Sequence, residues 1–177
     1  MKLKSILIAG LLAASSLGAQ AEDLSTTAAL TGIPNLSGGF SLTHLWSGLF
    51  TDTVTFTPNA SGMVDGGIMT IGFGTANIDF MSASINGNAL SLVAVPPNPG
   101  GGYFEAGYLL PTHIAGPLVL TVHGYAGPDN PMTTDRIPVS ATYTGSINVR
   151  AVPEPETYGM LLGGLGVLAF LSRRRKT

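Results

Sequence analysis

The sequence predicts an all-β fold, an antiparallel β-sandwich or jelly-roll-like domain set between two apolar ends. Three observations predict it. Apolar and polar residues alternate with a period of two through the middle of the chain, glycine and proline clusters separate the alternating runs, and helical periodicity is nearly absent there. About seven short strands with turn signals between them are typical of such sandwiches.

The clearest strand signal covers residues 139–150, where apolar side chains and a glycine alternate with hydroxyl, amide and arginine side chains. Pro138 precedes it, as suits the start of a strand. A second alternating run covers residues 49–57 and places Phe50, Asp52, Val54 and Phe56 on one face. Both runs predict strands with one buried face and one wet face.

Further strands are expected at residues 67–73, 77–84, 89–95, 103–110 and 117–125. Asn86-Gly87 predicts a tight hairpin because both residues tolerate positive φ. The proline- and glycine-rich stretches 96–102 and 126–131 predict loops. The domain is therefore expected to cover residues 39–150, with residues 22–38 as a loose leader.

The N-terminal end has the pattern of a secretory signal peptide over residues 1–21. Lys2 and Lys4 precede an apolar stretch at 5–17, and Ala19-Gln20-Ala21 forms an A-x-A cleavage site. The apolar stretch predicts a signal helix that is too short for a permanent anchor. We expect export and a mature chain that begins at Glu22.

The charge of the region between the two ends excludes nucleic acid as a partner. Residues 22–150 contain eight acidic residues against Arg136 and Arg150, so their net charge is −6. Proteins that bind nucleic acid need a basic surface. The chain has no cysteine, so disulfides are excluded and the hydrophobic core must hold the fold.

Motifs for catalysis, cofactors or metals are missing from the sequence. It has no G-x-S-x-G, phosphate-loop or H-E-x-x-H motif, and His44, His113 and His123 lack zinc-ligand spacing. We expect these histidines at the surface or in loops, with His123 on the wetter face of a strand. Asp65 and Asp79 are expected to cap turns. The sequence therefore predicts no enzyme, no catalytic residue, no cofactor and no metal.

Asp52 lies in register with core-facing residues and allows two interpretations. A buried carboxylate needs hydrogen bonds or an ion pair, so the backbone of a nearby loop is its expected donor. A calcium ligand is the sharper alternative, but it needs several further oxygen ligands. The few other acidic residues favour the first interpretation.

A row of threonines lies opposite these residues, at positions 51, 53, 55 and 57. A flat threonine array can match an ordered surface such as ice or a sugar lattice. Threonine also forms the ordinary wet side of a strand, because it combines a hydroxyl with high β propensity. The sequence shows one such row, so the ordinary interpretation is favoured.

The C-terminal end combines a Pro-Glu-Pro segment, an apolar run and a basic block. The apolar run at 158–171 would be about 21 Å long as a helix, short of the roughly 30 Å of a bilayer core. With Ser172 it predicts a single marginal transmembrane helix at 158–172. A basic tail at 173–177, with Arg173, Arg174, Arg175 and Lys176 as the topology signal, would stay in the cytoplasm.

This tail resembles the PEP-CTERM sorting signal of Gram-negative bacteria that make exopolysaccharide. Val152-Pro153-Glu154-Pro155-Glu156-Thr157 precedes the apolar run and the basic block, in the order of that signal, so residues 151–157 form the Pro-Glu-Pro linker. The resemblance implies recognition and cleavage near Pro153, Glu154 and Pro155 by exosortase, a membrane enzyme. A weak helix suits a temporary anchor in the inner membrane.

The central region resembles the FxDxF subgroup of PEP-CTERM proteins. Phe50, Asp52 and Phe56 match the subgroup motif, and Val54 stands where its second phenylalanine is expected. Members of this subgroup have no assigned enzymatic activity, and their β domain is similar to bacterial prepeptidase C-terminal sandwiches.

The resulting expectation is an exported, non-enzymatic protein of the cell surface or extracellular matrix, with a structural role in biofilm, exopolysaccharide or envelope. The alternative is a carbohydrate- or ice-surface-binding module displayed on the cell surface. Exposed aromatic residues would favour that alternative because they stack on sugar rings. The candidates are Trp46, Tyr103, Tyr108 and Tyr125.

Overall fold

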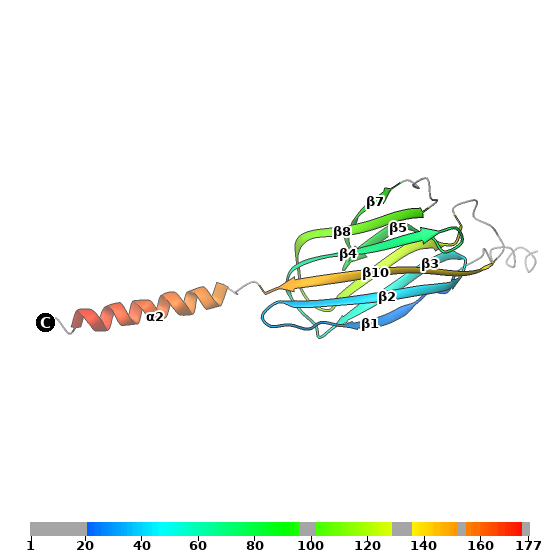
Figure 1. The fold of residues 1–177 in the computed structure, drawn as a ribbon. Coiled ribbons are helices and arrows are strands. Elements are labelled where there is room, and N and C mark those ends of the chain that lie inside the picture. Colours follow the sequence, from blue (N-terminus) through cyan, green and yellow to red (C-terminus); the bar gives the residue numbers. More distant parts are fainter. Residues whose placement is uncertain (1–20, 96–101, 129–135, 152–154, 175–177) are drawn as a thin grey trace, which may run out of the picture.

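The computed structural model describes residues 21–95, 102–128, 136–151 and 155–174 (Figure 1). Apart from Ala21, the expected signal peptide lies outside the described residues. So do Pro153 and Glu154 of the sorting motif and Arg175 and Lys176 of the basic block.

Within these described residues, ten strands form two five-stranded sheets, here named sheet A and sheet B. Sheet A has the order β1-β3-β9-β5-β6, with β1 at Ser25–Ala29, β3 at Gly48–Thr57, β9 at Leu118–Ala126, β5 at Ile78–Ile85 and β6 at Asn88–Ala89. Sheet B has the order β2-β10-β4-β8-β7, with β2 at Leu36–Trp46, β10 at Pro138–Arg150, β4 at Gly62–Phe73, β8 at Gly102–Ile114 and β7 at Ser91–Val95.

The strands predicted from alternation are confirmed. In β10 each residue from Val139 to Val149 on the apolar side is buried, apart from a half-buried Gly145, and the intervening residues are exposed. In β3 the side chains of Phe50, Asp52, Val54 and Phe56 are all buried. Asn86 and Gly87 adopt positive φ between β5 and β6, as the hairpin signal predicts.

Two expectations for the first part of the domain are wrong. Residues 22–38 are not a loose leader, because they contain β1 and the start of β2. β1 pairs in parallel with β3, so the sheets are not purely antiparallel. β2 was not expected because one glycine, Gly38, and a histidine, His44, stand among its inward positions and interrupt the apolar alternation.

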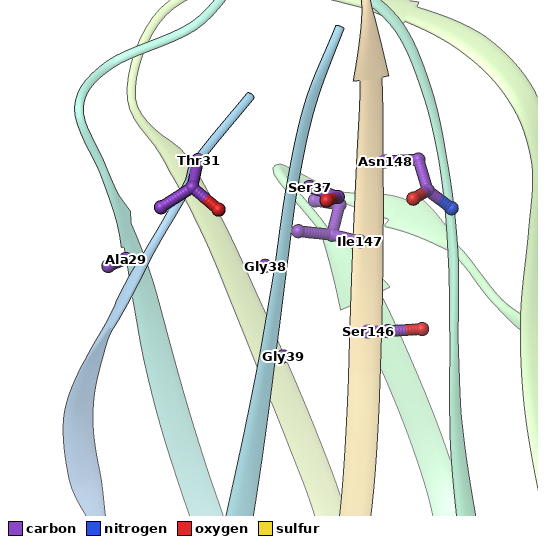
Figure 2. A pocket seen from close by; sticks show the side chains of 8 residues that line it. All are labelled: Ala29, Thr31, Ser37, Gly38, Gly39, Ser146, Ile147 and Asn148. Carbon is purple, nitrogen blue, oxygen red and sulfur yellow. The ribbon is translucent and has the colours of Figure 1, made fainter. Parts of the chain in front are cut away.

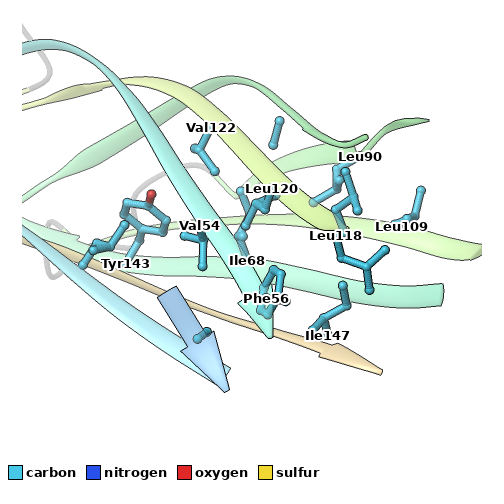
Figure 3. Packing of buried hydrophobic residues seen from close by; sticks show 14 of the residues in the cluster. Val54, Phe56, Ile68, Leu90, Leu109, Leu118, Leu120, Val122, Tyr143 and Ile147 are labelled. Carbon is cyan, nitrogen blue, oxygen red and sulfur yellow. The ribbon is translucent and has the colours of Figure 1, made fainter. Parts of the chain in front are cut away.

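The two sheets face each other across one hydrophobic core, which confirms the sandwich architecture. Figure 3 shows this core, with Val54, Phe56, Leu118 and Leu120 of sheet A close to Ile68, Tyr143 and Ile147 of sheet B. Aromatic rings meet edge to face between the sheets, Phe40 with Phe56 at 6.1 Å and Tyr143 with Phe80 at 5.5 Å between centroids. The jelly-roll connectivity stays a prediction.

The tail forms one helix, α2, at Pro155–Arg174, which extends away from the sandwich beyond the end of β10 (Figure 1). The described side chains of α2, at 159–169 and 171, are all exposed. In the described part of the chain, no helix has both the length and the apolar character required to cross a membrane. The transmembrane segment at 158–172 therefore stays a prediction.

Candidate functional site

The most distinctive feature of the interior is a buried carboxylate between the two sheets. Asp52 lies on β3 among core residues, and its exposed fraction is 0%. Its Oδ2 accepts hydrogen bonds from Tyr143 Oη at 2.7 Å and from His44 Nε2 at 2.9 Å, both on sheet B. Its Oδ1 accepts a hydrogen bond from the backbone N–H of Leu24 at 2.8 Å. Three donors therefore satisfy this carboxylate inside the core.

The structure distinguishes the two interpretations of Asp52. The expected backbone donor is confirmed, since Leu24 lies in the segment just before β1. The three groups around Asp52 are N–H and O–H donors, whereas calcium requires a shell of oxygen ligands. Among the described residues, no group of three or more histidine, aspartate or glutamate side chains could hold a metal ion.

His44 contradicts the expectation that it lies in a loop or at the surface. It is 0% exposed, and its ring stacks on Phe50 with 4.1 Å between centroids. The signal that could have identified it is its spacing in β2, two residues after Leu42 and four after Phe40, on the inward face. His113 and His123 are exposed as expected.

The electrostatics of this cluster hold Tyr143 in its protonated form. Burial raises the pKa of Tyr143 far above its ordinary value, and the negative charge of Asp52 and the hydrogen bond to it raise that pKa further. A protonated tyrosine can donate to the carboxylate, which an ionised tyrosine cannot do. The same low exposure separates the cluster from any substrate in solvent, because His44, Asp52 and Tyr143 are each 0% exposed.

The other two acidic residues singled out in the sequence lie in different sheets. Asp65 on β4 accepts a hydrogen bond from Asn148 Nδ2 at 3.1 Å and pairs with Arg150 at 3.3 Å. Asp79 on β5 accepts a hydrogen bond from Asn77 Nδ2 at 2.9 Å. These side-chain partners were not expected for residues assigned to turns.

The threonine row of β3 lies on the outer face of sheet A, as expected for the wet side of a strand. It is not a single row, however, because the neighbouring strands extend it. Strand register places Ser25, Thr121 and Ser84 in line with Thr53, and Thr27 in line with Thr55. Thr51 lies beside His123, with 2.9 Å between Oγ1 and Nδ1, and His123 is in register with Ser82. We call this surface the hydroxyl face; its members are Ser25, Thr27, Thr51, Thr53, Thr55, Thr57, Ser82, Ser84 and Thr121.

The four aromatic candidates differ in their exposure. Tyr108 is 47% exposed and Trp46 is 38% exposed, with the Arg136 guanidinium 5.0 Å above the Trp46 ring. Tyr103 is half-buried and Tyr125 is buried. Tyr108 and Trp46 are therefore the two exposed candidates for contact with a ligand.

An open depression lies where β2 and β10 run together near the end of β1 (Figure 2). Small and neutral residues line it, and Gly38 is required there because a Cβ would come within 2.5 Å of the Ala29 carbonyl oxygen. It offers no ionisable or nucleophilic side chain apart from hydroxyls, so its lining gives no catalytic chemistry.

Comparison with known proteins assigns the tail. Residues 151–176 match the PEP-CTERM protein-sorting motif. The chain matches no curated protein and no solved structure. The motif supports an exported protein that is sorted by exosortase, and exosortase is thus the implied processing partner. The match covers the tail and leaves the β domain to be interpreted from its own surface.

The buried cluster yields a stability prediction. Asp52→Ala leaves His44, Tyr143 and the Leu24 N–H without their acceptor, so we expect the free energy of unfolding to fall by about 3–5 kcal/mol. The matched control is Asp65→Ala, which breaks the pair with a 62% exposed Arg150 side chain. We expect that change to cost less than about 1 kcal/mol. Urea denaturation of both variants measures the difference, and equal losses would contradict a special role for Asp52.

The raised pKa of Tyr143 yields a prediction of pH dependence. Its phenol ionises near pH 10 in the unfolded chain but stays protonated in the fold, so its contribution to stability is complete below pH 10 and declines above it. We expect the free energy of unfolding to fall by up to about 1.4 kcal/mol per pH unit from this group between about pH 10 and 12. Tyr143→Phe removes this slope while the other tyrosines remain. If the free energies of unfolding of the wild type and of Tyr143→Phe changed with pH in the same way, Tyr143 would have the same pKa in the folded and the unfolded state, and the prediction would be wrong.

Proposed function

We propose that this chain is an exported, non-enzymatic protein of the cell surface or extracellular matrix, delivered there by its C-terminal tail. The observation that carries the proposal is the sorting motif at residues 151–176. In this proposal a precursor is held transiently at the inner membrane of a Gram-negative cell, and exosortase acts near Pro153, Glu154 and Pro155. The released domain takes a structural role in biofilm, exopolysaccharide or envelope.

The placement of the tail supports this order of events. β10 ends at Arg150, and α2 begins at Pro155. Prolines at positions 153 and 155 disfavour helix across the connecting segment. A cut in this segment would separate the helix from the sandwich without removing a residue from any strand. Arg173 and Arg174 form the end of α2, where cationic residues favour retention on the cytoplasmic side.

The interior supports a role without catalysis. The cluster of His44, Asp52 and Tyr143 is sealed inside the sandwich and joins its two sheets. A catalytic group must reach its substrate within hydrogen-bonding distance. The cluster therefore serves the fold.

The sorting step is tested by the mass and location of the protein in its native host. We expect a matrix species that begins at Glu22 and ends near Pro155, since both terminal segments are removed. Glu154→Gln should leave an unprocessed species in the membrane fraction, because it removes the charge within the Pro-Glu-Pro motif. Glu156→Gln, which alters the neighbouring acid just outside that motif, is the matched control and should be processed normally. A wild-type membrane species that keeps Arg173 to Thr177 would indicate an ordinary anchor instead.

A second candidate function, binding to a carbohydrate or to an ice surface, is supported by the hydroxyl face. One row of hydroxyls, Ser25, Thr53, Thr121 and Ser84, crosses β1, β3, β9 and β5, and shorter runs on β1, β3 and β5 flank it, so the hydroxyls extend in two dimensions. Neighbouring strands are about 4.8 Å apart, and alternate residues of one strand are roughly 6.7 Å apart. A regular surface of ligand hydroxyls or water molecules could match such spacings over several rows.

If the array binds a ligand, replacing its threonines by valine should weaken that binding, because valine has the shape of threonine but no hydroxyl. The triple variant Thr53→Val, Thr55→Val and Thr121→Val should reduce retention on insoluble matrix polysaccharide, or ice shaping, by about tenfold or more, because several hydrogen bonds are lost. The control is Thr142→Val with Thr144→Val on the outer face of sheet B. Trp46→Ala and Tyr108→Ala, tested on a glycan array, show whether aromatic stacking is used instead. If the wild-type protein binds neither matrix polysaccharide nor ice, this second candidate function is ruled out.

A further inference from the structure

The outer face of sheet B is divided into a polar half and an apolar half. On β2 and β10 the outward positions are mainly serine, threonine and glycine. On β4, β8 and β7 they include six large residues that are mainly apolar, and we call this surface the apolar patch. It consists of Met69, Ile71, Val93, Val95, Phe104 and Tyr108, with exposed fractions between 37% for Phe104 and 65% for Ile71.

Strand register shows that the apolar patch is continuous. Ile71, Phe104 and Val95 form one row across β4, β8 and β7. Met69, Ala106 and Val93 form the next row, and Tyr108 lies beside Gly67 in the third. None of these outward positions carries a charged side chain. Phe73, 59% exposed, extends the patch at one end, and Leu110, 68% exposed, extends it at the other.

The size of this surface exceeds what a monomer usually exposes. With roughly 200 Å² for a fully exposed side chain of this size, the patch and its two extensions expose on the order of 800 Å² of surface. The largest apolar patch of a typical monomer is about 300–600 Å². A stable protein–protein interface buries about 800 Å² on each partner. The patch therefore has the area of one half of an interface.

We propose that a second copy of this chain covers the apolar patch, with two sheets B packed face to face about a twofold axis. The charge distribution favours this occupant. With a net charge of −6 over residues 22–150, two copies repel each other over most of their surface, and the patch is a neutral region where they can approach. A twofold contact also lets one surface serve both partners.

The shape of the patch fits a twofold contact as well. The small residues Gly67 and Ala106 leave a shallow depression, walled by Met69 and Tyr108. A protruding side chain from the partner, such as its own Met69, can fill this depression. Flat sheets of two proteins that pack in this way lie about 10 Å apart.

Lipid and polysaccharide fit the patch less well. β10 ends at Arg150, in register with Met63, and α2 follows it; the exposed apolar side chains of β4 begin at Met69 and run toward Phe73, away from that end (Figure 1). A membrane held at α2 would therefore lie at the opposite end of the sandwich. Polysaccharide needs hydrogen-bonding partners, which valine, isoleucine and phenylalanine side chains cannot supply. The pairing of two copies does not depend on how the tail is processed.

Single cysteines test the pairing directly, because the chain has none of its own. Ala106→Cys lies at the centre of the apolar patch, and Thr53→Cys is the matched control at the centre of the hydroxyl face; both positions are half-buried on interior strands. Full-length chains are treated in the producing cells with a bis-maleimide that spans about 10 Å. We expect a cross-linked dimer from Ala106→Cys alone, after labelling with a mono-maleimide has shown that both thiols react.

A lysine in the patch supplies the second measurement. Ile71→Lys in the Ala106→Cys chain should reduce the yield of cross-linked dimer by about tenfold or more. The change removes apolar surface from the interface and places one lysine charge there from each copy. Thr55→Lys places the same charge on the hydroxyl face and should leave the dimer unchanged, and thermal melts confirm that each variant is folded. The proposal is overturned if Ala106→Cys gives no dimer, if both cysteines cross-link equally, or if Ala106→Cys links only to a different protein.

Discussion

The whole sandwich depends on one carboxylate held between its sheets. Asp52 belongs to sheet A, while the side chains that satisfy it, His44 and Tyr143, belong to β2 and β10 of sheet B. Its third donor is the backbone of Leu24, just before β1. An unpaired buried charge is costly, so the two sheets and the N-terminal segment must all be in place before Asp52 is buried. The hydrogen bonds thereby link the closure of the core to the docking of β1, without a disulfide in a chain that has no cysteine.

Because His44, Asp52 and Tyr143 are all buried in the core, we look for a binding function on the outer faces of the two sheets. Those faces differ in kind. Sheet A presents hydroxyls on four adjacent strands, with one row that crosses all four, whereas sheet B changes from hydroxyls on β2 and β10 to apolar side chains on β4, β8 and β7. A domain with these two surfaces can pair with its own copy through one face and leave the other open to an ordered ligand. Such an arrangement suits a component of an extracellular matrix, where each molecule must make more than one contact.

The sequence predicted the parts of the fold that depend on short-range patterns. Alternation identified β10 and β3 and placed Asp52 inward, because each pattern lies within one strand. It failed where partners come from distant segments. β1 has few apolar residues and is fixed by parallel pairing with β3. His44 is buried because it hydrogen-bonds to Asp52 and stacks on Phe50, both on a different strand. The hydroxyl face was missed for the same reason, since Ser25, Thr121 and Ser84 join Thr53 only through strand register.

Processing at both ends is compatible with this architecture. Cleavage after Ala21 would remove the hydrogen bond from its N–H to the Leu49 carbonyl, at 2.8 Å, but would keep everything from Glu22 onward. Asp23, which accepts the Thr51 N–H at 2.7 Å, and Leu24, which reaches Asp52, would both remain. At the other end, β10 is complete at Arg150, five residues before α2 begins at Pro155. The expected cut at the N-terminal end removes one buried alanine of the core cluster, Ala21, and both cuts spare every strand and the hydrogen bonds to Asp52. A domain built in this way can lose its signal peptide and its tail and retain the contacts that hold its two sheets together.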